Sequence, residues 1–141
     1  MNTLVEKLVI DLDEVPQLSS GARGKYADKL VIACSDAECT AVIVEEAKRV
    51  TKRDLDQAVA TASALKRGEL DQVIQQSGAN PSTIKSLVIA LHRLKKVDAV
   101  TASLARVMEK RLGVPIYIVE CSRNLDALIE RVARRARDSR K

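Results

Sequence analysis

Two apolar stretches separated by a short polar segment constrain the fold of this chain most. Residues 29–35 and 39–48 are rich in Val, Ile, Ala and Cys, and the sequence Asp-Ala-Glu at 36–38 lies between them. Runs of this length and composition, bounded by a polar turn, are typical of two antiparallel strands. The sequence therefore predicts a β-hairpin with a three-residue turn at 36–38.

Helical periodicity marks the chain on both sides of this hairpin. Leu4, Val5, Leu8 and Leu12 recur at helical spacing, which predicts an amphipathic helix over residues 3–13. The remaining expected elements follow in order: a helix at 51–68, a shorter helical segment at 69–76, a strand at 86–92, a helix at 97–112, a strand at 114–120 and a helix at 125–137. Helices that alternate with strands in this way predict an α/β fold with a mixed central sheet flanked by helices.

The length of the chain, 141 residues, fits a single domain over residues 1–141. The clearest break is the Ser-Gly-Ala-Asn-Pro segment at 77–81. Because neither flank is long enough to bury a core of its own, this segment predicts a surface loop and not a domain boundary.

The apolar runs and the cysteines bear on where the protein works. Its longest uninterrupted apolar runs span four or five residues, whereas a bilayer-spanning helix needs roughly 20. The N-terminal apolar stretch carries Glu6 and Lys7, which argues against a secretory signal. Cys34, Cys39 and Cys121 form an odd set without a C-x-x-C spacing, which favours reduced thiols over a disulfide framework or a structural zinc site. We therefore expect a cytoplasmic protein without a membrane partner.

The net charge of +5 is concentrated at the C-terminal end of the chain. Residues 131–141 hold six of the 24 basic side chains and one of the 19 acidic ones, which leaves 18 of each in the rest of the chain. A basic helix end of this kind is typical of proteins that bind an anionic partner such as nucleic acid, and it also complements the helix dipole. Because the chain has two tyrosines and no tryptophan or phenylalanine, we expect contacts with the phosphate backbone and little base stacking.

Three charged residues of the hairpin form the candidate catalytic group. With a three-residue turn, Asp28 lies directly opposite Glu46, and opposed side chains on one sheet face have Cβ atoms about 5 Å apart. Side chains alternate along a strand, so Lys48 shares the face of Glu46. Two adjacent carboxylates repel unless a cation lies between them, which predicts a metal site with a neighbouring ammonium group. A two-residue turn would instead set Asp28 opposite Glu45 and leave Lys48 on the other face.

The oxygen ligands of this group suit Mg2+ or Mn2+. A partly hydrated ion held by Asp28 and Glu46 would polarise a phosphate group and lower the pKa of a bound water. Lys48 would orient or deprotonate that water, or offset the charge that develops on the phosphate during the reaction. The group therefore predicts hydrolysis of a phosphodiester.

The same residues resemble the signature of the PD-(D/E)XK nucleases. Ala27-Asp28, a strand, a turn and the run IVEEAK, which ends in Glu46-Ala47-Lys48, follow the order of that signature, with Ala27 in the place of its proline. The resemblance implies a restriction-endonuclease-like fold. It also implies that Asp28 and Glu46 bind the metal and that Lys48 serves the attacking water.

Further features of the resemblance concern a third ligand, the next helix and the substrate. In this superfamily an acidic residue on the first helix often joins the metal ligands, and Glu6 is the candidate for that position. Gln57 is similar in placement to a glutamine on the helix that follows the lysine. Ser20-Gly21 and the overall length are similar to those of archaeal Holliday-junction resolvases, which are dimeric, so DNA is the expected partner and a homodimer is expected. Four basic residues are expected to contact the DNA backbone: Arg23, Lys25, Arg49 and Lys52.

Two other functions compete with the nuclease. A non-catalytic α/β module would bind nucleic acid or a protein through its C-terminal helix and would lose affinity with salt without cleaving anything. Its contact residues would be Arg131, Arg134, Arg135 and Arg137. A nucleotide- or small-ligand-binding fold would use the strand ends near Cys121, although the chain has no G-x-G-x-x-G or P-loop motif. Without a metal, the charged hairpin end would serve as a solvated strand edge that prevents aggregation.

Overall fold

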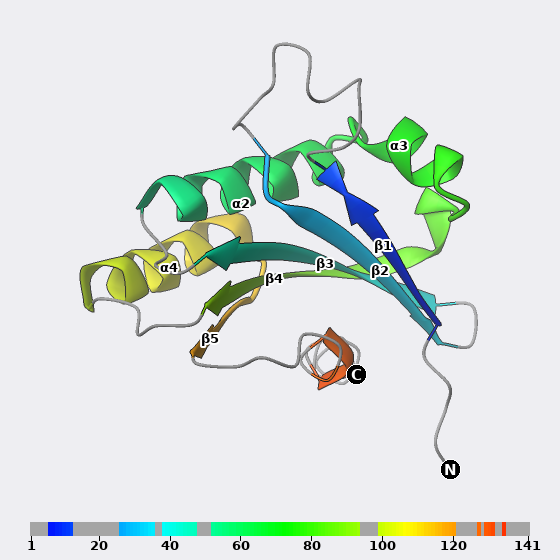
Figure 1. Cartoon of the computed structure of the whole chain (residues 1–141). Helices are drawn as coiled ribbons and strands as arrows, with labels where there is room; N and C mark the ends of the chain where they lie inside the picture. Colours follow the sequence, from blue (N-terminus) through cyan, green and yellow to red (C-terminus); the bar gives the residue numbers. More distant parts are fainter. Residues whose placement is uncertain are drawn as a thin grey trace.

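In the described part of the chain, five strands form one mixed sheet whose spatial order follows the order of the chain (Figure 1). The computed structural model describes residues 6–12, 26–35, 38–47, 52–93 and 99–120, and in the C-terminal part residues 127, 129–131 and 134. The strands are β1 (Glu6–Asp11), β2 (Lys29–Ser35), β3 (Glu38–Ala47), β4 (Ile84–Arg93) and β5 (Ile116–Glu120). The first three pair antiparallel, and β4 and β5 continue the sheet parallel to β3.

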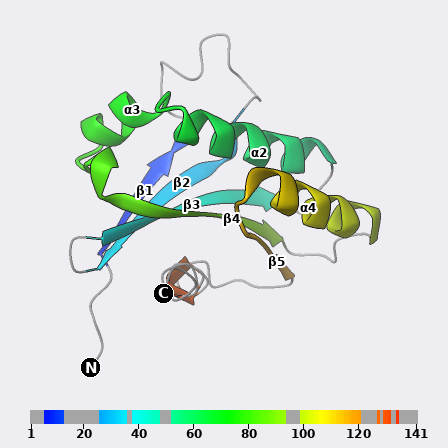
Figure 2. The same ribbon diagram turned by 180° about the vertical axis from the view of Figure 1, so that it is seen from behind.

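The helices connect the parallel strands and cover one face of the sheet. They are α2 (Lys52–Lys66), α3 (Asp71–Gln76) and α4 (Ala99–Leu112), and the 3-10 turn η2 (Pro81–Thr83) leads into β4. Parallel strands need such crossover connections because a tight turn joins only antiparallel strands. Figures 1 and 2 show the three helices together on the same side of the sheet. The predicted α/β fold, a mixed central sheet flanked by helices, is therefore confirmed.

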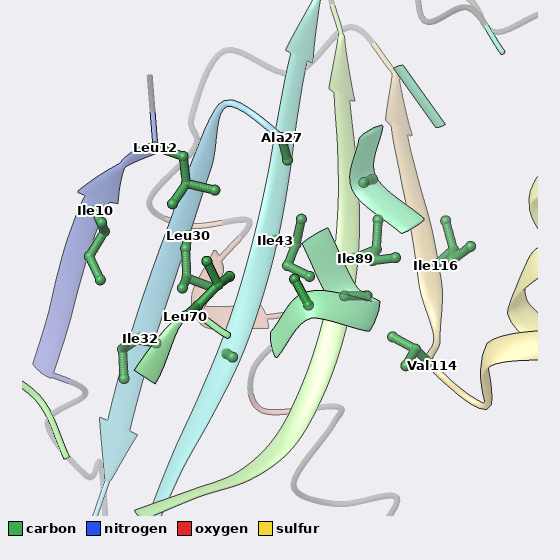
Figure 3. Close-up of a cluster of buried hydrophobic side chains, with 14 of the residues drawn as sticks. Ile10, Leu12, Ala27, Leu30, Ile32, Ile43, Leu70, Ile89, Val114 and Ile116 are labelled. Atoms are coloured by element: carbon green, nitrogen blue, oxygen red, sulfur yellow. The ribbon is translucent and has the colours of Figure 1, made fainter. Parts of the chain in front are cut away.

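The central strand β3 is apolar on both faces. Ile43 belongs to the cluster under the three helices, whereas Val42 and Val44 belong to a second cluster with Ile129, one of the helical residues near the C-terminus. Figure 3 shows Ile43 and Ile89 projecting to the same side from neighbouring strands. Burial on both faces is typical of a strand with parallel partners and covering elements on each side.

The helix predicted over residues 3–13 is wrong for the described part of that stretch, which forms β1 and begins to pair with β2 at its first residue. Leu8 and Leu12 fit one face of a helix, but Leu8, Ile10 and Leu12 also fit the period of a strand. In the structure Ile10 and Leu12 are buried while Val9, between them, is 53% exposed. A short apolar stretch fits either period, and here the available edge of β2 decides the outcome.

The hairpin is confirmed, but its turn is shorter than the expected three residues. Ser35 pairs with Glu38, so Glu38 begins β3 and only residues 36 and 37 separate the strands. The structure thus has the alternative register of the two-residue turn. Lys29 pairs with Val44, so the next position sets Asp28 opposite Glu45 and not opposite Glu46. A one-residue slip exchanges the faces of β3. Because both faces of β3 are apolar, the hydrophobic pattern could not separate the two registers.

This register joins two cysteines that the sequence analysis left reduced. Cys34 and Cys39 are direct partners across β2 and β3, their Cα atoms are 4.0 Å apart, and they form a disulfide. The expectation of reduced thiols is therefore wrong for this pair. Strand pairing, which a count of cysteines does not register, places the two side chains next to each other. Cys121 lies outside the described residues.

The other predicted elements are present with shifted ends. Helices α2, α3 and α4 and strands β4 and β5 correspond to the predictions at 51–68, 69–76, 97–112, 86–92 and 114–120. Gly113 ends α4 in the left-handed region with a φ of 67°, and its N–H donates to the carbonyl oxygen of Glu109 at 3.0 Å. The described residues between 127 and 134 are helical, inside the helix predicted at 125–137. None of the described helices is long and apolar enough to cross a bilayer.

Candidate functional site

The open end of the β2–β3 hairpin brings Asp28 and Glu46 together. A carboxylate oxygen of Asp28, Oδ2, accepts a hydrogen bond from the backbone N–H of Glu46 at 2.8 Å. Asp28 directly precedes β2, and Glu46 is the penultimate residue of β3. The structure thus brings the Asp28 carboxylate to the backbone of Glu46. The expected opposition of the two acids on one sheet face is wrong, because in this register Lys29 shares the face of Glu46.

Hydrogen bonds on both sides of Asp28 hold it in place. The buried N–H of Ala27 donates to Oγ1 of Thr61 at 2.8 Å, and this hydroxyl donates in turn to the carbonyl oxygen of Gln57 at 2.8 Å. The carbonyl oxygen of Asp28 itself accepts from the N–H of Leu12 at 3.1 Å. The start of β2 is thus tied to helix α2 and to the end of β1, and the position of the Asp28 carboxylate follows from these ties.

Replacing Thr61 by valine is expected to lower the free energy of unfolding by about 1–3 kcal/mol. Thr61 is fully buried, so the substitution leaves the buried N–H of Ala27 without its acceptor. The effect is measured by urea denaturation. Thr61→Ser is the matched control, because it keeps the hydroxyl, and it is expected to lose much less. Equal stability of the two variants would contradict this account.

Glu46 carries an exposed carboxylate that forms an ion pair with Lys29. The Lys29 Nζ atom lies 3.3 Å from Oε1 of Glu46. Lys29 pairs with Val44 in the ladder, so Glu46 is its diagonal neighbour on the same face. The contribution of a surface pair of this kind to stability is about 0–1 kcal/mol. Sequence reasoning missed Lys29 as part of the site, and the shorter register would have revealed it.

Glu45 is a second acid at this strand end, and its side chain is only 2% exposed. Side chains alternate along β3, so Glu45 lies on the face covered by the helices and Glu46 on the opposite face. Glutamate is rarely buried to this extent in proteins. The two neighbouring glutamates therefore have opposite environments, one buried and one exposed.

The site lies at the carboxyl edge of the parallel part of the sheet. Strands β3, β4 and β5 end side by side there, with Glu46 paired to His92 and Arg93 paired to Glu120. Open α/β sheets bind ligands at the carboxyl ends of their strands. The position of Asp28 and Glu46 is therefore one where a substrate can approach.

The other predicted site residues have different locations. Glu6 pairs with Cys34 at the opposite end of β2 from Asp28. The six-residue step from Asp28 to Cys34 corresponds to roughly 20 Å along a strand. The structure thus does not bring Glu6 together with Asp28 and Glu46, and the first helix on which its role depended is a strand.

The remaining candidates concern the lysine of the signature and the basic contacts. Lys48, Arg23, Lys25 and Arg49 lie outside the described residues, as do Arg135 and Arg137. Lys52 is the first residue of α2 and is exposed. Arg131 and Arg134 are exposed helical residues.

The candidate metal ligands among the described residues are the carboxylates of Asp28 and Glu46. Within the part of the chain that the structure describes, no group of three or more His, Cys, Asp or Glu side chains is arranged to hold an ion. Mg2+ in phosphoryl chemistry is commonly held by one or two carboxylates, with water and substrate phosphate completing its shell. Of the two candidate ligands, Asp28 contacts the backbone N–H of Glu46, and the Glu46 carboxylate pairs with Lys29.

Comparisons with known proteins add no relative to this picture. No family model matches the chain, and no similar protein was found among the curated proteins or the solved structures.

Proposed function

We propose that this protein is a divalent-metal-dependent nuclease that hydrolyses the phosphodiester bonds of DNA. The observation that carries the proposal is the contact between the Asp28 carboxylate and the Glu46 backbone at 2.8 Å. It joins the acid before the first hairpin strand to the segment Glu46-Ala47-Lys48, at the carboxyl edge of a mixed sheet. The resemblance to the PD-(D/E)XK signature assigns the same residues to this chemistry.

In this proposal Asp28 and Glu46 hold Mg2+ or Mn2+, Lys48 serves the attacking water, and Lys29 offsets part of the charge of Glu46. When bound, the ion polarises the phosphate and lowers the pKa of a water molecule. The Asp28 oxygen that faces the Glu46 N–H is fixed by that hydrogen bond, so the site is ordered before an ion arrives. The Lys29 ammonium partly neutralises Glu46 until a metal competes with it.

The proposal also includes how DNA is held. Lys52 is exposed at the start of α2, the element that comes after β3 in the chain. Arg23 and Lys25 precede Asp28 in the sequence, and Arg49 follows Lys48. Contacts of these residues with phosphates would position the backbone without reading its sequence. A homodimer would supply two such sites, one for each strand of a duplex.

The proposal is tested by incubating the purified protein with supercoiled plasmid, linear duplex, single-stranded DNA and a four-way junction, in Mg2+, Mn2+ or EDTA. We expect cleavage of at least one substrate with either ion and none in EDTA. Glu46→Ala and Lys48→Ala are expected to remove the cleavage. Cleavage that persists in EDTA, or cleavage by both variants at the wild-type rate, would overturn the metal-site assignment.

A non-catalytic binding module is the second candidate, favoured by the exposure of Arg131 and Arg134 on the C-terminal helix. The ion pair with Lys29 and the capped N–H of Glu46 would then be structural features of the strand end. This alternative predicts salt-sensitive binding of DNA without cleavage. It also predicts that truncation after Glu130 removes the binding, whereas the nuclease keeps its ion-dependent cleavage.

A further inference from the structure

A cavity of about 310 Å3 opens beside the disulfide at the closed end of the hairpin. Both cysteines line it, together with Leu8, Ile32 and residues of the segment that precedes β4, Asn80 and Thr83 among them. This end of β2 lies six residues from Asp28, so the cavity is separate from the candidate nuclease site. A small thiol can reach a disulfide that lines such a cavity, whereas a disulfide in a packed core is shielded from it.

The two sulfur atoms have different surroundings. Cys39 is 5% exposed, whereas Cys34 is partly buried and only packs against the edge of the core cluster. The hydroxyl of Thr83 lies 3.3 Å from Sγ of Cys39 and 2.6 Å from the carbonyl oxygen of Asn80. Access therefore favours attack at Cys34, and the polar neighbour lies next to Cys39.

We propose that the Cys34–Cys39 disulfide is a site of thiol–disulfide exchange with a small thiol that enters this cavity. The thiolate of the small molecule attacks Sγ of Cys34, the bond between Cys34 and Cys39 breaks, and Cys39 leaves as a thiolate. Cys34 then carries a mixed disulfide. A second small thiol releases Cys34 as a thiolate and departs as the oxidised small-molecule disulfide, so two thiols are oxidised for each protein disulfide reduced.

Thr83 makes Cys39 the better leaving group. A thiolate is a stronger hydrogen-bond acceptor than a disulfide sulfur, so the single hydroxyl proton of Thr83 shifts toward Cys39 as the bond breaks. A thiolate that accepts a hydrogen bond is stabilised and leaves faster. Thr83 thus acts as a positioning residue for the exchange.

The hairpin keeps its shape when the disulfide opens. The Cys34–Cys39 pair has ladder partners on both sides, with Ser35 and Glu38 toward the turn and Ala33 and Thr40 toward the open end. Strand β1 pairs with β2 and β4 pairs with β3 along the same stretch. Exchange therefore takes place in the folded protein and does not require unfolding.

The test uses the native, full-length protein with 2-mercaptoethanol, followed by N-ethylmaleimide and peptide mapping by mass spectrometry. We expect the mixed disulfide on Cys34 and the maleimide on Cys39, at a rate well above that of global unfolding measured in the same buffer. A thiol-terminated polyethylene glycol, which is too large for the cavity, is expected to react at least about tenfold more slowly.

Variants at Thr83 test the leaving-group assignment. Thr83→Val is expected to slow opening about threefold, whereas Thr83→Ser keeps the hydroxyl and the wild-type rate. Circular dichroism confirms that both variants are folded. Adducts mainly on Cys39, equal rates for the small and the large thiol, or opening only at the rate of unfolding would each overturn the proposal. None of these readouts depends on DNA cleavage, so they stand apart from the nuclease proposal.

Discussion

Asp28→Asn is expected to lower the rate of metal-dependent DNA cleavage about a hundredfold or more. The substitution removes the negative charge that would hold the ion. The amide oxygen can still accept the hydrogen bond from the Glu46 N–H, so the strand end keeps its geometry. The measurement is kcat/KM for the preferred substrate at saturating Mg2+, with thermal unfolding of the same preparation as a check on the fold.

The matched control for this prediction is Lys29→Gln. It removes the ion pair with Glu46 but leaves both carboxylates in place, and it is expected to change the cleavage rate by no more than about threefold. If Asp28→Asn cleaves as well as the wild type, the Asp28 carboxylate serves only as a cap for the end of β3. If Lys29→Gln lowers the cleavage rate as much as Asp28→Asn does, the loss comes from the charge balance of the strand end and not from metal binding.

Ile43→Ala is expected to lower the free energy of unfolding by about 2–5 kcal/mol. Ile43 is fully buried in the middle of the central strand and faces the helix layer. Removing three carbon atoms there loses the transfer free energy of those atoms and leaves a cavity that strands on both sides cannot close. Urea denaturation followed by circular dichroism measures the change as a shift in midpoint.

Val100→Ala is the control for the core substitution, because Val100 lies on α4 with 78% of its surface exposed. It is expected to change stability by less than about 0.5 kcal/mol. A loss at Val100 as large as that at Ile43 would indicate that α4 is covered by a further surface. A loss below about 1 kcal/mol at Ile43 would indicate that the sheet collapses around the missing side chain.

The hairpin, α2, the strand after it and α4 could all be predicted from the sequence. The helices have apolar residues at the helical period, the strands are short apolar runs, and polar or glycine-containing segments separate them. Asp28 and Glu46 could be selected because the two strands had to meet with their free ends together, whichever turn closed them. The contact of Asp28 with the end of β3 was therefore predictable, whereas the acid that shares its face depended on the register.

The register and the N-terminal strand could not be predicted in the same way. Val42 and Val44 are as apolar as Ile43, so a slip of one residue leaves the hydrophobic pattern of β3 unchanged. Leu8 and Leu12 satisfy the helical and the strand period alike, and only pairing with β2 separates the two. The disulfide, the burial of Glu45 and the role of Lys29 all follow from the register, which explains why they were missed together.

The two kinds of strand pairing also divide the folding of the chain into a local and a non-local part. β1, β2 and β3 pair with their immediate neighbours in sequence, and the two-residue turn brings β2 and β3 together with little loss of chain entropy. β3 and β4 are separated in the sequence by α2 and α3, so their pairing closes a long loop of chain. Contacts between distant segments form slowly. The three antiparallel strands β1–β3 would therefore serve as the template on which β4 assembles. The carboxyl edge of the sheet, which carries Glu46, would then be completed last.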